Sequence, residues 1–224
     1  MERIDDLQFN GLKLIQDDEC FCFGTDSVEL ANFVVPGKNK PACDLGSGSG
    51  ILSVLLAAKK GYKVTAVEVQ ERLAELCQKN VELNNLQQQI TVVNQRMQDF
   101  CVNENKGKFD VVITNPPYQK LGSGDARVNE SILIARSEIL VTLDKVIECA
   151  SHLTKFGGLF YIVHKTERLA EVITLCTQNL LQPKILQVLT PNSTKPPHLF
   201  LLSCIKNGKA GIKVLKERTV NMKV

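Results

Sequence analysis

The residues with the most specific chemistry are Asn115, Pro116, Pro117 and Tyr118, which follow the apolar run Phe109–Thr114. The Asn side-chain oxygen and the next backbone carbonyl both accept hydrogen bonds, and proline nitrogens cannot donate competing ones. Two such acceptors can hold both hydrogens of an amine whose lone pair is spread into a π system, so that the lone pair turns toward an electrophile. The Tyr118 ring offers a face for a planar base, worth ~1–3 kcal/mol per base. The same four residues also fit a stiff turn after a strand.

A second motif lies in residues 40–53, which indicate a strand end, a glycine-rich turn and a helix start. Glycines let the backbone come close to a ligand, and the helix start presents unpaired N–H groups. The acidic Asp44 stands two positions before Gly46, which disfavours an anion and favours a ligand that carries an ammonium and a sulfonium. We therefore expect Asp44, Gly46, Ser47 and Gly48 to contact such a ligand.

The next expected strand, Lys63–Glu68, ends in a carboxylate. A carboxylate about 20 residues after the glycine turn, at the carboxyl end of a strand, is placed to accept both ribose hydroxyls of a nucleoside. Glu68 alone also fits a solvated strand end. The order of glycine turn, Glu68 and Asn-Pro-Pro-Tyr favours the ligand role.

These motifs, in this order, resemble the class I S-adenosylmethionine-dependent methyltransferases of the Asn-Pro-Pro-Tyr type. More closely, the chain is similar to the N6-adenine methyltransferases that modify the adenine beside the anticodon of a valine tRNA. The general motifs cover residues 40–118, and the closer resemblance rests on four further segments. These segments are Phe23–Ser27, Ala135–Ile139, Val163–Leu169 and Lys195–Leu199.

The resemblance implies methyl transfer from S-adenosyl-L-methionine to N6 of an adenine in tRNA. It implies catalytic roles for Asn115, Pro116, Pro117 and Tyr118. The residues expected at the cofactor are Asp44, Gly46, Ser47, Gly48, Glu68, Val69, Met97, Asp99 and Asn115.

The contact to the adenine of the cofactor departs from the family pattern. Relatives usually place an Asp after the third strand, where this chain has Arg96. Either Asp99 accepts from the exocyclic amine, or the backbone N–H of Met97 binds a ring nitrogen. Asp99 also fits a solvated loop position.

Expected strands and helices alternate along the chain, which predicts a mostly parallel α/β sheet with helices on both faces. The resemblance adds a Rossmann-like methyltransferase sheet of seven strands, the last of them antiparallel. Strands are expected at 63–68, 90–93, 109–114, 158–163, 185–189 and 199–205, and helices at 50–60, 70–84, 132–153 and 167–179.

The segment before the first expected helix fits a capping box, with Asp26 at the N-cap and Glu29 at N3. The resemblance also places this segment over the methionine end of the cofactor. Residues 20–24 would then belong to a lid.

Length and composition predict one globular domain over residues 1–224, with 44% hydrophobic and 23% charged residues. We divide it into an N-terminal lid and helix (1–39), a catalytic core (40–206) and a basic tail (207–224). The chain lacks an apolar run of ~18 residues and a signal peptide, so we expect a cytoplasmic protein without a membrane partner. Eight scattered cysteines without Cys-x-x-Cys predict reduced core thiols and no metal site. We expect a monomer.

The basic residues concentrate near the end of the chain, although the whole chain carries a net charge of only +3. Lys209, Lys213 and Lys216 lie in this tail, and Lys120 and Arg127 lie in the Gly- and Ser-rich loop that follows Tyr118. A basic end on an otherwise slightly acidic enzyme suits a phosphate backbone, so we expect these five residues to contact RNA. They also fit solvated surface.

Two other functions fit parts of the pattern. Protein-glutamine methyltransferases carry the same Asn-Pro-Pro-Tyr motif, because an amide nitrogen poses the same problem, but they normally have an added N-terminal helical domain. This chain reaches its glycine turn by Gly46, which leaves no room for one. A non-catalytic RNA-binding module of the same fold is disfavoured because Asp44, Glu68, Asn115 and Tyr118 are all present.

Overall fold

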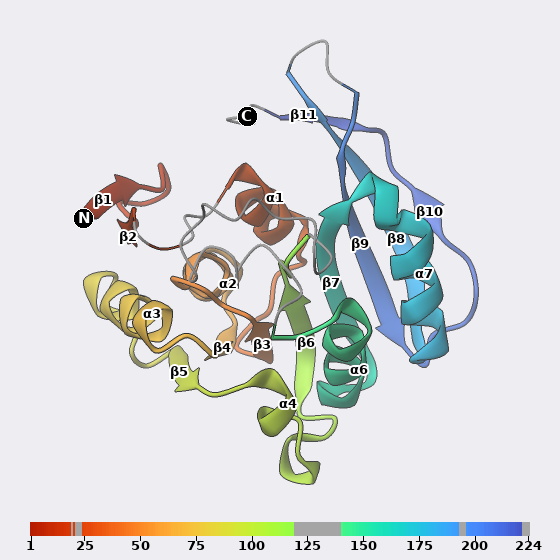
Figure 1. Ribbon diagram of the computed structural model, residues 1–224, viewed down its shortest axis with the longest axis horizontal. Helices are drawn as coiled ribbons and strands as arrows, with labels where there is room; N and C mark the ends of the chain where they lie inside the picture. The colour runs from red at the N-terminus through yellow and green to blue at the C-terminus, as the bar shows by residue number, and fades with distance from the viewer. Residues whose placement is uncertain (19, 21–23, 119–139, 193–195, 221–224) are drawn as a thin grey trace.

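A computed structural model describes residues 1–18, 20, 24–118, 140–192 and 196–220. A central sheet runs through the molecule, with helices on both sides of it (Figure 1). The expected loop at 119–130, the segment 135–139 and the beginning of the helix expected at 132–153 lie outside the described residues.

Seven strands form the centre of the sheet, in the order β8-β9-β7-β6-β3-β4-β5. Neighbouring strands are parallel except that β9 runs antiparallel to both β7 and β8. The mostly parallel sheet with an antiparallel last strand is therefore confirmed. The bounds are β3 Pro41–Leu45, β4 Lys63–Glu68, β5 Ile90–Asn94, β6 Phe109–Thr114, β7 Thr154–Lys165, β8 Leu181–Pro191 and β9 Leu199–Lys206.

The tail adds two short strands, β10 (Lys213–Val214) and β11 (Arg218–Val220), which both pair in parallel with β8. The described part of the sheet therefore has nine strands instead of the expected seven. The tail pairs with β8 because β8 would otherwise be an edge strand with unpaired backbone groups. Arg218 also pairs with Glu29 of the first helix at 2.8 Å, which fixes the tail to the rest of the molecule.

Alternating side chains of the central strands fill two separate cores. On one face Ala42, Val111 and Ile113 pack against helices α1, α2 and α3, and on the other Cys43 and Val112 pack against α4, α6 and α7. Both faces of these strands are covered, which explains their continuous apolar runs. The helices are α1 Thr25–Phe33, α2 Ile51–Lys60, α3 Glu71–Leu83, α4 Met97–Phe100, α6 Leu143–Leu153 and α7 Leu169–Gln178, with short 3₁₀ turns η1 Asn103–Asn105 and η2 Thr166–Arg168.

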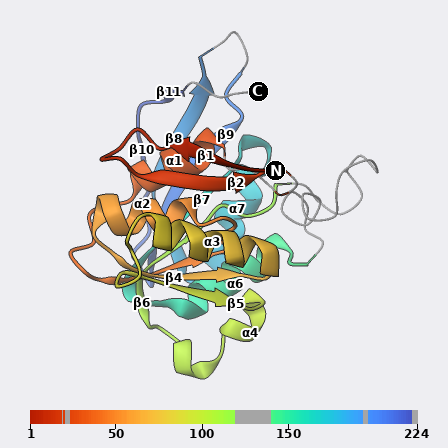
Figure 2. The same cartoon turned by 90° about the vertical axis from the view of Figure 1, so that its left-hand side faces the viewer.

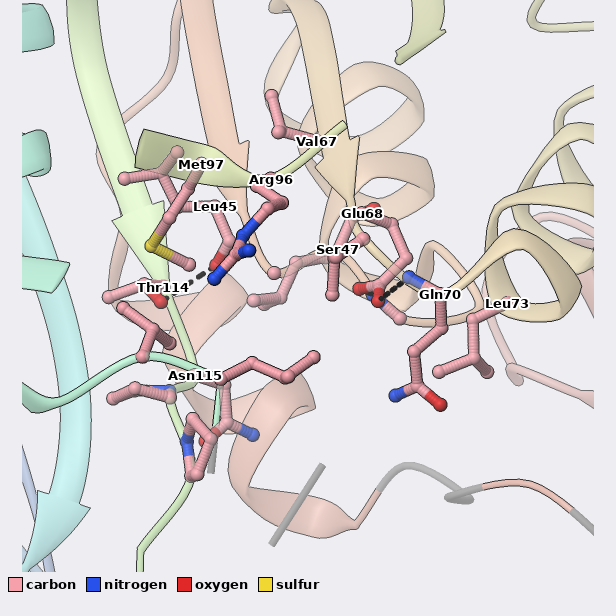
Figure 3. Close-up of a pocket in the computed structure, with 18 of the residues that line it drawn as sticks. Leu45, Ser47, Val67, Glu68, Gln70, Leu73, Arg96, Met97, Thr114 and Asn115 are labelled. Atoms are coloured by element: carbon pink, nitrogen blue, oxygen red, sulfur yellow. Dashed lines mark hydrogen bonds between the residues drawn. The ribbon is translucent and has the colours of Figure 1, made fainter. Parts of the chain in front are cut away.

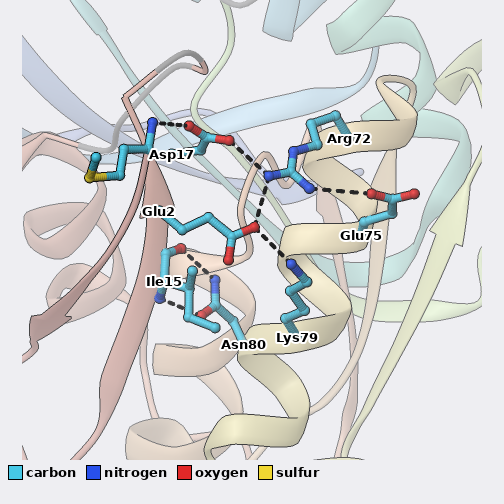
Figure 4. A network of polar contacts seen from close by, with 8 residues as sticks. Glu2, Ile15, Asp17, Arg72, Glu75, Lys79 and Asn80 are labelled. Carbon is cyan, nitrogen blue, oxygen red and sulfur yellow. Dashed lines mark hydrogen bonds and ion pairs between the residues drawn. The ribbon is translucent and has the colours of Figure 1, made fainter.

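An N-terminal hairpin of β1 (Glu2–Asp6) and β2 (Lys13–Asp17) was not expected from the sequence. It packs on α3 (Figure 2), where Arg72 pairs with Glu2 and with Asp17, both at 2.8 Å (Figure 4). Asn80 of α3 donates to the carbonyls of Ile15 at 3.0 Å and Ser49 at 2.9 Å. The hairpin, α3 and the glycine turn are thereby held together.

The cysteines that the structure describes form no disulfide, and all but Cys101 are buried. For these seven residues the prediction of reduced, mostly buried thiols is confirmed. Over the described ranges, every helix is too short or too polar to cross a membrane.

Candidate active site

A cavity opens at the carboxyl ends of β3, β4 and β6, where parallel α/β sheets bind their ligands (Figure 3). It collects most of the predicted site residues from segments far apart in the chain. Those that line it are Gly46, Ser47, Gly48, Glu68, Val69, Met97, Asn115, Pro116 and Pro117. Asp44, Asp99 and Tyr118 do not line it.

The glycine turn takes a backbone shape that other residues adopt only with strain. Gly46, Gly48 and Gly50 have φ of +72°, +55° and +90°. A Cβ at Gly50 would also lie 2.5 Å from the sulfur of Cys77 on α3. The N–H groups of Gly46 and Ser47 both donate to the Val67 carbonyl, at 2.9 and 3.0 Å, which fixes the turn to the end of β4.

Glu68 ends β4 and is only 5% exposed. Its Oε2 accepts from the N–H of Gly48 and its Oε1 from the N–H of Gln70, both at 2.9 Å. Burial raises the pKa of Glu68, and these hydrogen bonds oppose that shift. Each carboxylate oxygen keeps a further lone pair, so Glu68 can still accept from two ligand hydroxyls.

Asp44 lies behind the glycine turn and is fully buried. Its Oδ2 accepts from the Ser53 hydroxyl at 2.7 Å, while its Oδ1 has no hydrogen-bond partner among the described residues. Burial raises the pKa of Asp44 to about 7, with the Ser53 hydrogen bond opposing the shift. A buried acceptor without a donor is costly, and a cationic ligand group near the turn would reduce that cost.

The sequence left open whether Asp99 or the backbone of Met97 contacts the adenine of the cofactor, and the positions of these two residues distinguish the alternatives. Arg96, Met97 and Gln98 line the cavity at the start of α4. Asp99 is exposed and uses its backbone N–H within this turn, donating to the Arg96 carbonyl at 3.0 Å. The structure therefore brings Met97, and not Asp99, together with the other predicted cofactor residues.

The chain that follows β6 brings Asn115, Pro116 and Pro117 to the cavity, with Tyr118 beside them. The Thr114 hydroxyl donates to the Leu45 carbonyl at 2.8 Å, which joins the ends of β6 and β3. Asn115 lies beside this junction and donates through Nδ2 to Asp26 Oδ2 at 3.1 Å and to Ser27 Oγ at 2.9 Å. The Tyr118 hydroxyl lies 2.6 Å from both Asp26 Oδ2 and Asn115 Oδ1.

The expected capping box at the start of α1 is wrong. The helix begins at Thr25 with Gly24 as its N-cap, and no side-chain cap hydrogen bond is formed. The Asp26 carboxylate instead contacts Asn115 and Tyr118, and Glu29 pairs with Arg218. Asp26 and Ser27 lie in the first turn of α1 and contact the predicted catalytic residues Asn115 and Tyr118, a contact that the capping pattern alone does not indicate.

His164, near the end of β7, is a further residue that the sequence analysis did not assign to the site. Its ring lies 5.2 Å from the Tyr118 ring at 54°, and its Nδ1 accepts from the Lys165 N–H at 2.8 Å. Burial, together with the positive charge of Arg168, lowers the pKa of His164 to about 3. It is therefore a neutral packing surface under the Asn-Pro-Pro-Tyr turn.

The predicted RNA-binding residues divide into two groups. Lys209, Lys213 and Lys216 are exposed and belong to the tail that runs along β8. In the sheet order β8 is separated from β3 by β9, β7 and β6, so these lysines do not border the cavity. Lys120 and Arg127 lie outside the described residues.

Comparison with known proteins gives a family and a set of relatives. The profile of the family "Methyltransferase small domain" matches residues 25–174. A Shewanella baltica (strain OS185) protein named tRNA1(Val) (adenine(37)-N6)-methyltransferase is 38% identical over 111 residues, which are 49% of this chain and 47% of the relative. A Bacteroides thetaiotaomicron protein of the same name is 28% identical over 89% of this chain and 84% of its own. The chain spans about half the length of the Shewanella baltica relatives that it matches.

Solved structures with the same fold are more distant in sequence. A predicted O-methyltransferase from Agrobacterium tumefaciens has a TM-score of 0.66 at 21% identity, covering 87% of this chain and 86% of its own. Pyrococcus horikoshii TYW2, crystallised with MeSAdo, has a TM-score of 0.64 at 15% identity. The match covers 92% of this chain and 72% of the TYW2 chain. These likenesses show a shared methyltransferase fold. With the family profile spanning more than half of its length, this chain belongs to the methyltransferase small domain family.

Proposed function

We propose that this protein transfers a methyl group from S-adenosyl-L-methionine to N6 of an adenine in tRNA, in the cytoplasm. The observation that carries the proposal is that Asn115 and Pro116 line the same cavity as the glycine turn and Glu68. The amine-holding residues and the nucleoside-binding residues are thereby adjacent. The relatives' names supply the specific target, adenine 37 of a valine tRNA.

The described side chains suit this cofactor. Asp44 Oδ1, which has no hydrogen-bond partner in the described part of the chain, lies behind the turn where a positively charged amino-acid end would bind. Glu68 retains lone pairs for ribose hydroxyls. Met97 offers apolar surface and a backbone N–H to the adenine, beside Arg96. When bound, S-adenosyl-L-methionine supplies a methyl group on a positively charged sulfur.

The target base meets the acceptors at the end of β6. The base is turned out of its stack, as in other enzymes that modify a base. Asn115 Oδ1 and the Pro116 carbonyl accept from the two N6 hydrogens, which holds the amine with its lone pair toward the methyl group. The Tyr118 ring, which also contacts the tilted His164 ring, provides the face against which the base packs.

The work of the protein is positioning. Holding the reacting atoms in line and excluding water supplies most of the acceleration. A strong base is unnecessary, because the methylated amine becomes acidic and loses its extra proton readily.

The tRNA would be held partly through charge. The exposed Lys209, Lys213 and Lys216 provide positive charge along the outer edge of the sheet. We also propose that Lys120 and Arg127, which follow Tyr118 in the chain, contact the tRNA.

Methyl transfer from labelled S-adenosyl-L-methionine to separate pools of unmodified tRNA, rRNA, DNA and protein tests the proposal. Label recovered as N6-methyladenosine in tRNA, and at position 37 of a valine tRNA transcript, supports it. Label on glutamine in the protein pool would identify a glutamine methyltransferase instead. RNA binding without transfer to any pool would identify a non-catalytic module.

A further inference from the structure

The two ends of an Asn side chain are chemically different, and only one of them suits the proposed reaction. The oxygen accepts hydrogen bonds, whereas the amide nitrogen donates two. To hold the amine of a target base, Asn115 must present Oδ1 to the cavity and direct Nδ2 elsewhere. Something in the protein has to enforce that choice.

The Asp26 carboxylate fixes the amide orientation of Asn115. It only accepts hydrogen bonds when ionised, and its Oδ2 lies 3.1 Å from Asn115 Nδ2. A flipped Asn115 would oppose two acceptor oxygens at this distance. Ser27 adds a second acceptor, its hydroxyl oxygen, 2.9 Å from Nδ2. A carboxylate therefore selects one amide orientation, which a neutral amide at position 26 would not.

Asp26 also contacts the Tyr118 hydroxyl, which competes for Asn115 Oδ1. This hydroxyl lies 2.6 Å from Asp26 Oδ2 and also 2.6 Å from Asn115 Oδ1, but it has one hydrogen to donate. Burial and the negative charge of Asp26 raise the pKa of Tyr118, so that hydrogen is retained. Asp26 thus gives the hydroxyl an alternative acceptor. When the target amine donates to Asn115 Oδ1, the hydroxyl donates to Asp26 and its oxygen separates from Asn115 Oδ1, because two acceptor oxygens without a hydrogen between them repel each other.

From this geometry we infer that Asp26 is a positioning residue for methyl transfer: it fixes the amide orientation of Asn115 and takes the Tyr118 hydroxyl away from Asn115 Oδ1. The inference rests on the proposed function. Asp26 does not line the cavity, so it acts through Asn115 and Tyr118 and not on the substrate.

A purely structural role for Asp26 predicts different behaviour. Asp26 is the second residue of α1, where an acidic side chain stabilises the start of a helix through its dipole. Asp144 occupies the same position in α6, is exposed and does not line the cavity. Asp144→Asn is therefore a matched control that removes the same charge from the same helical position.

The first measurement compares steady-state methyl transfer to a valine tRNA transcript, with S-adenosyl-L-methionine binding followed by calorimetry. We expect Asp26→Asn to lower kcat roughly 10- to 100-fold, the loss for one or two hydrogen bonds to a charged group. The dissociation constant for S-adenosyl-L-methionine should change by less than about threefold, whereas the loss of a cofactor contact worth ~1.4 kcal/mol would change it tenfold. Asp144→Asn should match the wild type in both.

The second measurement exchanges the two side chains. Asn115→Asp alone places two carboxylates against each other and should be poorly active. The exchange Asp26→Asn with Asn115→Asp restores one donor and one acceptor across the same contact, and leaves a carboxylate oxygen for the amine. We expect this double variant to exceed Asn115→Asp in kcat, a result that loss of helix stability at position 26 cannot produce.

The outcomes separate the inference from the function on which it rests. No transfer by the wild-type protein to any RNA would overturn the proposed function. An active wild type with unchanged kcat in folded Asp26→Asn would overturn the role of Asp26 alone. If Asp26→Asn alone does not fold, the kcat of the double variant is compared with that of Asn115→Asp. A double variant no more active than Asn115→Asp would overturn the inference.

Discussion

The backbone N–H of Gly48 donates a 2.9 Å hydrogen bond to the carboxylate of Glu68, which joins the glycine turn to the end of β4 beside the cavity. Gly48 lies in the turn that follows β3, and Glu68 ends β4, the adjacent parallel strand. Loss of the Glu68 carboxylate would therefore remove both the proposed cofactor contact and a support of the turn.

We predict that Glu68→Ala weakens S-adenosyl-L-methionine binding by roughly 1.5–3 kcal/mol, the range for hydrogen bonds to a charged group. Isothermal calorimetry measures this directly. Glu82→Ala, an exposed carboxylate on α3, is the control and should bind like the wild type. Unchanged affinity in a folded Glu68→Ala protein would exclude Glu68 from the site.

Asp44 makes the stability of the ligand-free protein depend on pH. Its pKa is raised by burial from 3.8 to about 7, so the folded protein binds a proton that the unfolded chain has released between these values. Stability is therefore highest below about pH 4 for this group and falls as pH rises toward 7. Asp44→Asn should flatten that part of the curve in urea unfolding between pH 4 and 8. An unaltered pH profile in the variant would contradict the raised pKa.

Asn115 separates chemistry from cofactor binding. Asn115→Ala should abolish methyl transfer, because the acceptor for the target amine is lost, and should leave S-adenosyl-L-methionine affinity within about threefold, under ~1 kcal/mol. Transfer assays and calorimetry on the same preparation decide it. Asn103→Ala, on the exposed η1 turn, should behave like the wild type. Residual transfer near the wild-type rate would show that another group holds the amine.

Tyr118 separates the aromatic face from the hydroxyl. Tyr118→Ala should lose the stacking surface, worth ~1–3 kcal/mol per base, and lower transfer accordingly. Tyr118→Phe keeps that surface and its packing on His164, so it should retain most of the rate and lose about 1 kcal/mol of stability with its hydrogen bond. Comparing kcat and thermal unfolding of both variants tests this. A Phe variant as inactive as the Ala variant would refute the stacking role.

The parts of the fold that the sequence predicts well are those with strong local signals. The strands 63–68 and 109–114 have the expected bounds, because apolar side chains on both faces require burial. The glycine turn is also predicted correctly, because its positive φ angles favour glycine and the glycines are visible in the sequence.

What the sequence does not predict depends on contacts between distant segments. Asp26 acquires its role from Asn115, 89 residues later, and in isolation it has only the pattern of a capped helix. The strand β1 is mostly exposed and charged, so it lacks the apolar periodicity that marks a strand. The strands β10 and β11 are short and exist because β8 offers an edge.

The basic tail carries the last prediction. Lys209, Lys213 and Lys216 are exposed along β8, and contacts to phosphates give an affinity that falls with salt, with a log–log slope of about −0.7 per contact for single strands and −0.9 for duplex DNA. Changing all three to Gln should weaken tRNA binding and flatten its salt dependence. It should leave S-adenosyl-L-methionine binding and the choice of adenine unchanged, because the tail does not line the cavity.

The control for this triple variant removes the same charge from elsewhere on the surface. Lys38, Lys40 and Lys63 are exposed at the amino ends of β3 and β4, the opposite end of the strands from the cavity. Changing these three to Gln lowers the net charge equally, so any difference in salt slope between the two variants reports position and not total charge. Salt-titrated binding to one valine tRNA transcript makes the comparison. Equal slopes for the wild type and the tail variant would mean that the tail makes no phosphate contact, and the RNA surface would then be sought around Lys120 and Arg127.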